Sequence, residues 1–165
     1  LHAAAGNGHM DVVESLVAKG ANVNARENDG STPLRIAAYN GYRGAAEMLI
    51  AKGANVNVKE NDGSTPLSWA VIGREKGLVE LLIAKGADVG TKEKDGSTPL
   101  YWAVIGGEKG IAELLIARGA DVNARDFRGR TLLREALEIG DKGMIELLEK
   151  NGALDPQSGR ALLRK

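Results

Sequence analysis

The chain has 165 residues, 43% of them hydrophobic and 27% charged, and its 22 basic and 22 acidic side chains give a formal net charge of zero. This balance argues against a general attraction to nucleic acid or an anionic membrane, and the lack of cysteine excludes disulfides and thiolate chemistry. No apolar run approaches the roughly 20 residues of a membrane-spanning helix, and no signal-peptide pattern opens the chain. We expect a protein of the cytoplasm or another reducing intracellular compartment.

In chain order, the sequence repeats itself every 33 residues. The string Asp-Gly-Ser-Thr-Pro-Leu begins at Asp29, Asp62 and Asp95, and a degraded copy follows at 128–133. Because the chain starts within this pattern at Leu1, we expect residues before it to be missing. We divide the single domain 1–165 into a partial unit 1–28, full units 29–61, 62–94 and 95–127, a terminal unit 128–155, and a capping segment 156–165.

Each unit has the local chemistry of a turn followed by two helices. Asp29-Gly30 favours a tight turn, since Asp tolerates left-handed backbone and Gly accepts positive φ without penalty. Thr32-Pro33 is a good helix start, because Thr caps and Pro needs no N–H at the first position. A second apolar helix ends at a Lys-Gly-Ala or Arg-Gly-Ala string, whose Gly predicts a left-handed cap.

The motifs Thr-Pro-Leu-x-x-Ala and Leu-Leu-Ile-Ala-x-Gly-Ala-Asp/Asn-Val-Asn, held in phase over about residues 1–155, resemble the ankyrin repeat. The resemblance implies an all-α solenoid of stacked L-shaped helix-loop-helix units joined by β-turn tips. It also implies that the tips and the first helix of each unit line a concave face. Like other solenoids, such a stack needs its terminal units shielded, which is the role we expect for 156–165.

Three departures from the family pattern bear on the stack. In the third unit, Gly90 replaces the Asn of Val-Asn, so we expect a looser loop there. Arg74 replaces the Gly after the first helix, and we expect Gly73 to take over that role one residue earlier. The family His after Thr-Pro-Leu is kept only at His2, which puts inter-unit hydrogen bonds in doubt in the other units. The matching positions there hold Arg35, Ser68, Tyr101 and Arg134.

Catalytic and metal-binding patterns are weak in this sequence. His2 and His9 are the only histidines, both stand where the family has structural histidines, and no strained elbow or oxyanion-hole pattern accompanies Ser15. The Asp-Gly turns lack the ligand spacing of calcium loops, and Gly106-Gly107 lacks the context of a phosphate loop. We therefore expect a non-enzyme without a cofactor or metal, and keep hydrolysis based on His2 or His9 as a remote alternative.

A binding surface is predicted from helical spacing, since residues four apart share a face. Counting i, i+4 and i+8 from the residue after each turn Gly gives a stripe opposite the core face, with large side chains at several positions. We expect Trp69 and Trp102 to stack in the core between units instead. The stripe holds Ser31, Arg35 and Tyr39; Ser64, Ser68 and Ile72; Ser97, Tyr101 and Ile105; and Arg130, Arg134 and Glu138.

The turn tips add residues that vary while the frame repeats. Their charge changes from acidic to basic along the chain, and Phe127 lies among several arginines. Interleaved acids and the zero net charge favour a mixed-charge surface over a nucleic-acid platform. The candidate partner-binding residues are Asn28, Asp29, Arg35, Tyr39, Asn61, Ile72, Lys94, Tyr101, Ile105, Phe127, Arg128 and Arg130.

The leading hypothesis is a monomeric, non-catalytic module that binds a protein partner on the concave face and turn tips. The alternative is an engineered or consensus-like scaffold with no natural partner. Units 62–94 and 95–127, identical at 23 of 33 positions, fit that alternative, and a recent natural duplication would explain them equally well.

Overall fold

The computed structural model describes residues 1–154, which form paired helices and connecting loops with no β-strand in that range. The expected capping segment 156–165 lies outside the described residues. Each unit contributes one helix pair. The helices are α1 (His2–Gly6), α2 (Met10–Ala18), α3 (Pro33–Tyr39), α4 (Arg43–Ala51), α5 (Pro66–Ile72), α6 (Lys76–Ala84), α7 (Pro99–Ile105), α8 (Lys109–Ala117), α9 (Leu132–Ile139) and α10 (Lys142–Lys150).

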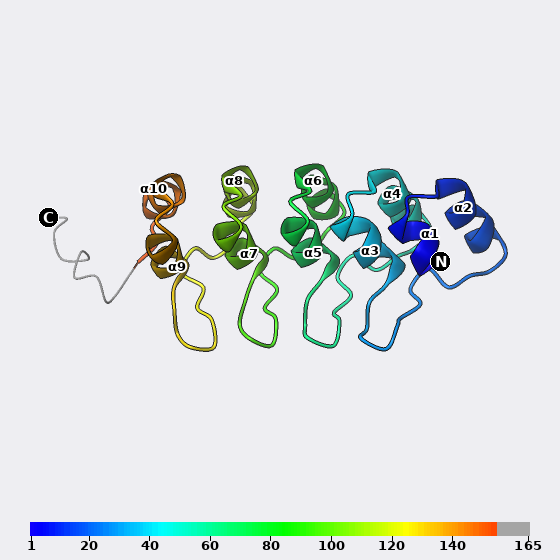
Figure 1. Ribbon diagram of the computed structural model, residues 1–165, viewed down its shortest axis with the longest axis horizontal. Coiled ribbons are helices and arrows are strands. Elements are labelled where there is room, and N and C mark those ends of the chain that lie inside the picture. The colour runs from blue at the N-terminus through cyan, green and yellow to red at the C-terminus, as the bar shows by residue number, and fades with distance from the viewer. Residues whose placement is uncertain (155–165) are drawn as a thin grey trace, which may run out of the picture.

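The pairs stack side by side into a solenoid, as the sequence predicts (Figure 1). The shorter first helices α1, α3, α5, α7 and α9 form one row, and the second helices form another row above it in this view. Long loops between consecutive pairs project to one side of the first-helix row. These projecting loops carry the turn tips, so tips and first helices share one side of the molecule.

Small residues on the first helices allow close stacking. Ala37 and Ala38 of α3 are fully buried, and the core positions beside them are filled by leucines from both helix rows. A buried leucine that loses a neighbouring unit would leave apolar surface in water, which disfavours isolated units. The leucines that repeat through the core at 0–1% exposure are Leu34, Leu67 and Leu100 in the first row, and Leu49, Leu82, Leu115 and Leu148 in the second.

The predicted helix starts are confirmed. The hydroxyl oxygen of Thr32 accepts a hydrogen bond from the Arg35 N–H at 3.3 Å, and Thr65 and Thr98 cap α5 and α7 in the same way. In the terminal unit, Thr131 caps α9 although Leu132 replaces Pro at the first helical position. A good cap stabilises a helix by about 1 kcal/mol, so each short first helix begins at a fixed residue.

The expectation that Gly73 replaces the missing Gly at position 74 is wrong. Arg74 itself adopts the left-handed conformation, with φ 62°, while Gly73 is right-handed with φ −71°. Gly73 has a different role, because a Cβ there would lie 2.3 Å from the carbonyl oxygen of Tyr39. The turn after α5 therefore keeps the left-handed backbone that Gly8, Gly41, Gly107 and Gly140 adopt at the equivalent positions, and Arg74 is strained as a result.

The Asn residues of the Val-Asn motif join consecutive units. The side chain of Asn57 donates to the Gly86 carbonyl at 2.9 Å and accepts from the Asp88 N–H at 2.8 Å. Asn24 and Asn123 make the same pair of bonds with the units that follow them. Gly90 occupies this position in the third unit and has no side chain to make them. The junction between the third and fourth units is therefore missing this clamp.

Candidate functional site

The turn tips form a continuous row held together by backbone hydrogen bonds. The N–H groups of Asn61, Lys94 and Phe127 each donate to the carbonyl of the Asp in the preceding tip, at 2.9–3.1 Å. Within a tip, the carboxylate of Asp29 accepts the Ser31 N–H at 2.9 Å, and this bond lowers the pKa of Asp29. Neighbouring tips are thus fixed relative to one another, and they present their side chains from a defined row.

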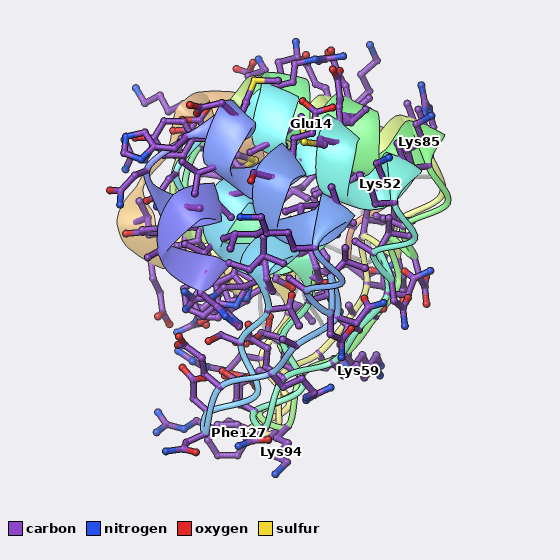
Figure 2. All side chains as sticks on the ribbon, turned by 90° about the vertical axis from the view of Figure 1, so that its right-hand side faces the viewer. Glu14, Lys52, Lys59, Lys85, Lys94 and Phe127 are labelled. Carbon is purple, nitrogen blue, oxygen red and sulfur yellow. The ribbon has the colours of Figure 1, made fainter. Side chains whose placement is uncertain are left out.

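The candidate residues of the tips are all exposed: Asn28, Asp29, Asn61, Lys94, Phe127 and Arg128. Phe127 is 69% exposed, the most of any large hydrophobic side chain in the described chain. The guanidinium carbon of Arg128 lies 5.1 Å from the centre of its ring. Figure 2 shows Phe127 and Lys94 at the far end of the loops, away from Lys52 and Lys85, which directly follow the second helices α4 and α6.

The predicted stripe on the first helices is only partly correct. Its opening residues Ser31, Ser64 and Ser97 are buried, and so is Ser68. The first helices begin at Pro33 and its equivalents, so the residue after the turn Gly is not helical and the four-residue spacing does not apply to it. Instead, the hydroxyl of Ser64 turns inward and donates to the carboxylates of Glu60, at 3.3 Å, and Asp62, at 2.6 Å.

The large stripe residues do reach the surface to different degrees. Tyr39 is 44% exposed and Ile105 is 37% exposed, whereas Arg35, Ile72 and Tyr101 are half-buried. Tyr39 also contacts Trp69 edge to face, with ring centres 5.7 Å apart. On the side formed by the tips and first helices, the exposed large apolar side chains therefore lie at the C-terminal ends of α3, α7 and α9, where α9 ends in the 53% exposed Ile139, and at the tip bearing Phe127.

The expectation that Trp69 and Trp102 stack in the core between units is only partly correct, because Trp102 packs against the edge of the core but neither ring is fully buried. Both are half-buried, and the ring contacts of each are with a tyrosine of the first-helix row: Tyr39 for Trp69 and Tyr101 for Trp102. Their indole N–H groups point to the loops, where Trp69 donates to Glu60 at 3.2 Å and Trp102 to Glu93 at 2.9 Å. An indole N–H needs a partner when it leaves water, and this need orients both rings.

Sequence reasoning missed a row of acidic residues in the loops, whose burial ranges from exposed at Glu27 to buried at Glu60. Glu27, Glu60, Glu93 and Asp126 recur every 33 residues, each four residues before the position held by Ser31 and its equivalents. The hydroxyl of Ser31 donates to Glu27 at 3.2 Å, so the first tip has the same serine–carboxylate bond that Ser64 and Glu60 make in the second. The 33-residue period of these acids is the signal that could have revealed them.

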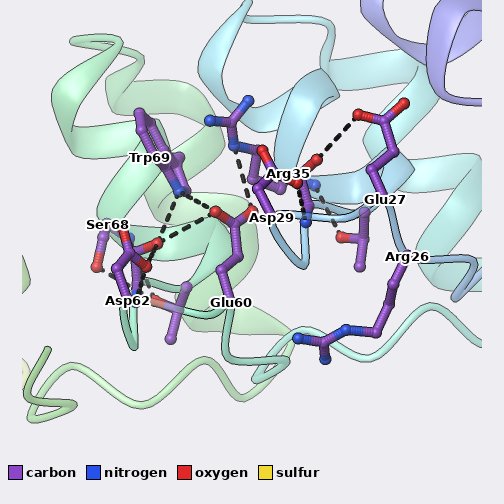
Figure 3. A network of polar contacts seen from close by, with 12 residues as sticks. Arg26, Glu27, Asp29, Arg35, Glu60, Asp62, Ser68 and Trp69 are labelled. Carbon is purple, nitrogen blue, oxygen red and sulfur yellow. Dashed lines mark hydrogen bonds and ion pairs between the residues drawn. The ribbon is translucent and has the colours of Figure 1, made fainter. Parts of the chain in front are cut away.

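Glu60 connects two units through Arg35 (Figure 3). The Arg35 Nε lies 3.3 Å from the Glu60 Oε1, and the guanidinium carbon lies 3.9 Å from the Trp69 ring centre. Burial raises the pKa of Glu60, while the charge of Arg35 and the hydrogen bonds from Trp69 and Ser64 act against that rise. Arg35 thus joins its own helix to the next loop, which leaves less of its charge available to a partner than the sequence suggests.

Where the other units lack the equivalent of His2, different side chains make the contacts between units. His2 lies 3.2 Å from the Ser31 carbonyl oxygen, as its structural interpretation predicts. Burial also raises the pKa of Glu93, and hydrogen bonds from Trp102 and from Ser68 of the preceding unit oppose that shift. Arg35 and Ser68 therefore connect neighbouring units in place of histidine, which answers the doubt raised by the sequence.

Arg130 is the candidate whose charge is most fully neutralised. Its guanidinium lies between Asp126, at 2.9 Å, and Glu135, at 2.8 Å. Glu135 stands where the preceding units have tryptophan, so an arginine between two carboxylates replaces the indole–carboxylate pair. Arg130 consequently stabilises the last tip, and the exposed cations beside it are Arg125 and Arg128.

Within residues 1–154, no three His, Asp or Glu side chains are grouped in a way that could hold a metal ion. None of the helices described is long and apolar enough to cross a membrane.

Comparison with known proteins agrees with the architecture. A family model described as ankyrin repeats (3 copies) matches residues 1–60, 52–126 and 74–159. No curated protein matches the chain.

Proposed function

Because the chain belongs to the ankyrin-repeat family, we propose that it is a non-catalytic module that binds a protein partner on the side formed by its turn tips and first helices. The observation that carries this proposal is the placement of exposed large side chains on a fixed frame. Phe127, Tyr39 and Ile105 remain 69%, 44% and 37% exposed. Each is held by a tip or helix that is itself bonded to its neighbour.

The physical argument concerns the entropy of binding. Association loses less free energy when the binding groups are already ordered, because fewer rotamers and loop conformations are lost. Tyrosine and phenylalanine bury much area with only two side-chain torsions, which makes them effective anchors. Tyr39 is further restrained by its edge-to-face contact with Trp69. The surface therefore combines apolar anchors with a polar surround, as binding patches do.

A catalytic role has little support from the same contacts. His2 is engaged with the Ser31 carbonyl between two units, and His9 is an exposed residue at the N-terminus of α2. An ester-hydrolysis assay that gives the same rate for the chain and for its His2→Ala/His9→Ala variant would agree with the proposal. A rate lost only in the variant would contradict it.

The proposal is tested by quantitative affinity capture with three baits. These are the unchanged chain, the Tyr39→Ala/Phe127→Ala variant, and a control, Met10→Ala/Tyr42→Ala, which truncates two side chains of 45% and 38% exposure elsewhere. We expect a protein that is retained by the first and third baits and lost from the second. Purified, that protein should bind the second variant at least tenfold more weakly than the control.

The opposite results are equally informative. Equal binding to all three baits would place the interface elsewhere on the molecule. Failure of every bait, including the unchanged chain, to retain any protein would favour the alternative of a consensus-like scaffold without a natural partner. Melting curves of the two variants complete the test, since a large loss of stability in Tyr39→Ala/Phe127→Ala would assign those residues to packing instead.

A further inference from the structure

The last described tip differs in charge from the first. Residues 26–31 contain Arg26 against Glu27 and Asp29, whereas residues 125–130 contain three arginines against the single acid Asp126. The formal charge of these two segments is therefore −1 and +2. The row of tips changes from acidic to basic while its backbone geometry repeats.

Two of the three arginines keep their charge exposed. Arg130 is enclosed by carboxylates, but among residues 1–154 the Nη1 of Arg125 donates only to a backbone carbonyl, that of Gly129, at 2.8 Å. Arg128 lies against the Phe127 ring. Lys94 belongs to the adjoining tip, which the Phe127 N–H joins by a 2.9 Å bond to the Asp95 carbonyl. We name Lys94, Arg125, Phe127 and Arg128 the basic tip cluster.

The last tip keeps its turn although Arg128 stands where the earlier tips have Asp. In the earlier tips, the Asp at the position of Arg128 accepts the backbone N–H two residues later. In the last tip, Asp126 has taken over, and one of its carboxylate oxygens accepts both the Arg128 and the Arg130 N–H at 2.9 Å. The charge at position 128 is thus reversed without loss of the turn's hydrogen bond. An exposed cation beside an exposed phenyl ring is left free to bind.

We propose that the basic tip cluster binds a short acidic segment of the partner protein, whose carboxylates meet Lys94, Arg125 and Arg128 and whose apolar side chain lies on Phe127. This inference rests on the proposed function and adds the chemistry of the partner. Arginine forms two parallel hydrogen bonds with a carboxylate, and the phenyl ring supplies apolar area next to them. The binding segment is therefore expected to combine Asp or Glu with a neighbouring large apolar residue.

An acidic peptide fits this cluster better than a nucleic-acid strand does. A single strand carries one phosphate for every nucleotide, so its charge would continue over the neighbouring tips. Those tips present Asp95, Asp62 and Asp29, and the Ser31 N–H lowers the pKa of Asp29, which keeps it ionised. A peptide can place its carboxylates at the cluster alone and avoid this repulsion.

The test is selection from a displayed library of random 12-residue peptides. The immobilised targets are the unchanged chain, the Lys94→Glu/Arg128→Glu variant, and the control Lys52→Glu/Lys85→Glu, which changes the net charge equally. Lys52 and Lys85 are exposed at the ends of second helices, away from the tips (Figure 2). We expect Asp and Glu enrichment on the unchanged chain and the control. A labelled selected peptide should bind the Lys94→Glu/Arg128→Glu variant at least tenfold more weakly than the control.

Three results would overturn the inference. Selected peptides without acidic enrichment that still lose binding on Tyr39→Ala/Phe127→Ala would refute the acidic chemistry and leave the proposed function standing. Failure to select any peptide on any target would count against both. A labelled 15-residue oligothymidylate that binds more tightly than the selected peptides, and is released by Lys94→Glu/Arg128→Glu, would assign the cluster to nucleic acid.

Discussion

Restoring the missing clamp between the third and fourth units should stabilise the chain. The perturbation is Gly90→Asn, which copies the residue at the equivalent positions 24, 57 and 123. The backbone is ready for it, because the Gly90 N–H bonds to the Asp88 carboxylate at 2.9 Å just as the Asn57 N–H bonds to the side chain two residues before it. A Cβ at Gly90 would lie 3.4 Å from that carboxylate oxygen, and Gly90 is not among the positive-φ glycines.

The magnitude follows from the two bonds that the new side chain can make. By analogy with Asn57, it should donate to the Gly119 carbonyl and accept the Asp121 N–H. Two partly exposed hydrogen bonds at about 0.5 kcal/mol each, with about 0.5 kcal/mol from the reduced freedom of the unfolded chain, total about 1.5 kcal/mol. At about 2–4 °C per kcal/mol for a chain of this size, the melting temperature should rise by about 3–6 °C.

The assay is thermal and urea unfolding followed by circular dichroism, with two controls. Gly90→Ala reduces backbone freedom without adding a hydrogen bond, and Asn57→Gly removes the clamp from the preceding junction. We expect the order of stability to be Gly90→Asn, then Gly90→Ala, then the unchanged chain, then Asn57→Gly. Equal stability of Gly90→Asn and Gly90→Ala would refute the reasoning, because the gain would then come from the unfolded chain alone. Hydrogen exchange should also show added protection at the Asp121 N–H.

Two further predictions concern strain and buried charge. Arg74→Gly should raise the free energy of unfolding by about 1 kcal/mol. Left-handed backbone costs a non-Gly residue about 1–2 kcal/mol, and the exposed ion pair of Arg74 with Glu108 contributes less than that. Arg74→Ala keeps the strain and loses the ion pair, so urea unfolding should show a lower free energy of unfolding for it than for the unchanged chain. Glu93→Gln should flatten the pH dependence of stability. Burial raises the folded-state pKa of Glu93, so its contribution is most favourable below the unfolded value near 4.3 and is lost as pH rises through the folded value. Unfolding curves from pH 4 to 7 should therefore show the unchanged chain losing stability relative to Glu93→Gln; parallel curves would contradict this sign.

Features set by neighbouring residues were predictable from the sequence. The turn glycines, the Thr caps and the end of each second helix depend on chemistry within a few residues, and the structure places them as expected. The 33-residue period then determines the stack, because each apolar helix pair needs a neighbour to cover it. The 33-residue period therefore predicted the fold, and local motifs predicted where its helices begin and end.

Features set by contacts between units were not predictable in the same way. Ser64 was placed on the surface because helical spacing was extended to a residue that precedes the helix. Trp69 was placed in the core because its hydrophobicity was weighed without the partner that its N–H needs. That partner, Glu60, lies nine residues earlier and also meets Arg35 of the preceding unit. Burial at these positions depends on contacts among residues of two neighbouring units, and the sequence of a single unit does not reveal them.

Each loop has residues that stabilise the stack and other residues that are exposed at its tip, so the exposed surface can vary while the frame repeats. Residues that point into the loops, such as Ser64 and Glu60, satisfy the polar groups that the stack buries. Residues at the tips are joined mainly through backbone N–H and carbonyl groups, which every side chain except proline leaves available, and the added bond from the Asn61 side chain to the Asn28 carbonyl is not available to Lys94 or Phe127 in the same form. The position held by Asn28, Asn61, Lys94 and Phe127 can therefore change in charge and size while the tip row stays intact. We therefore expect this position, more than the half-buried Arg35, to determine the specificity of the proposed binding.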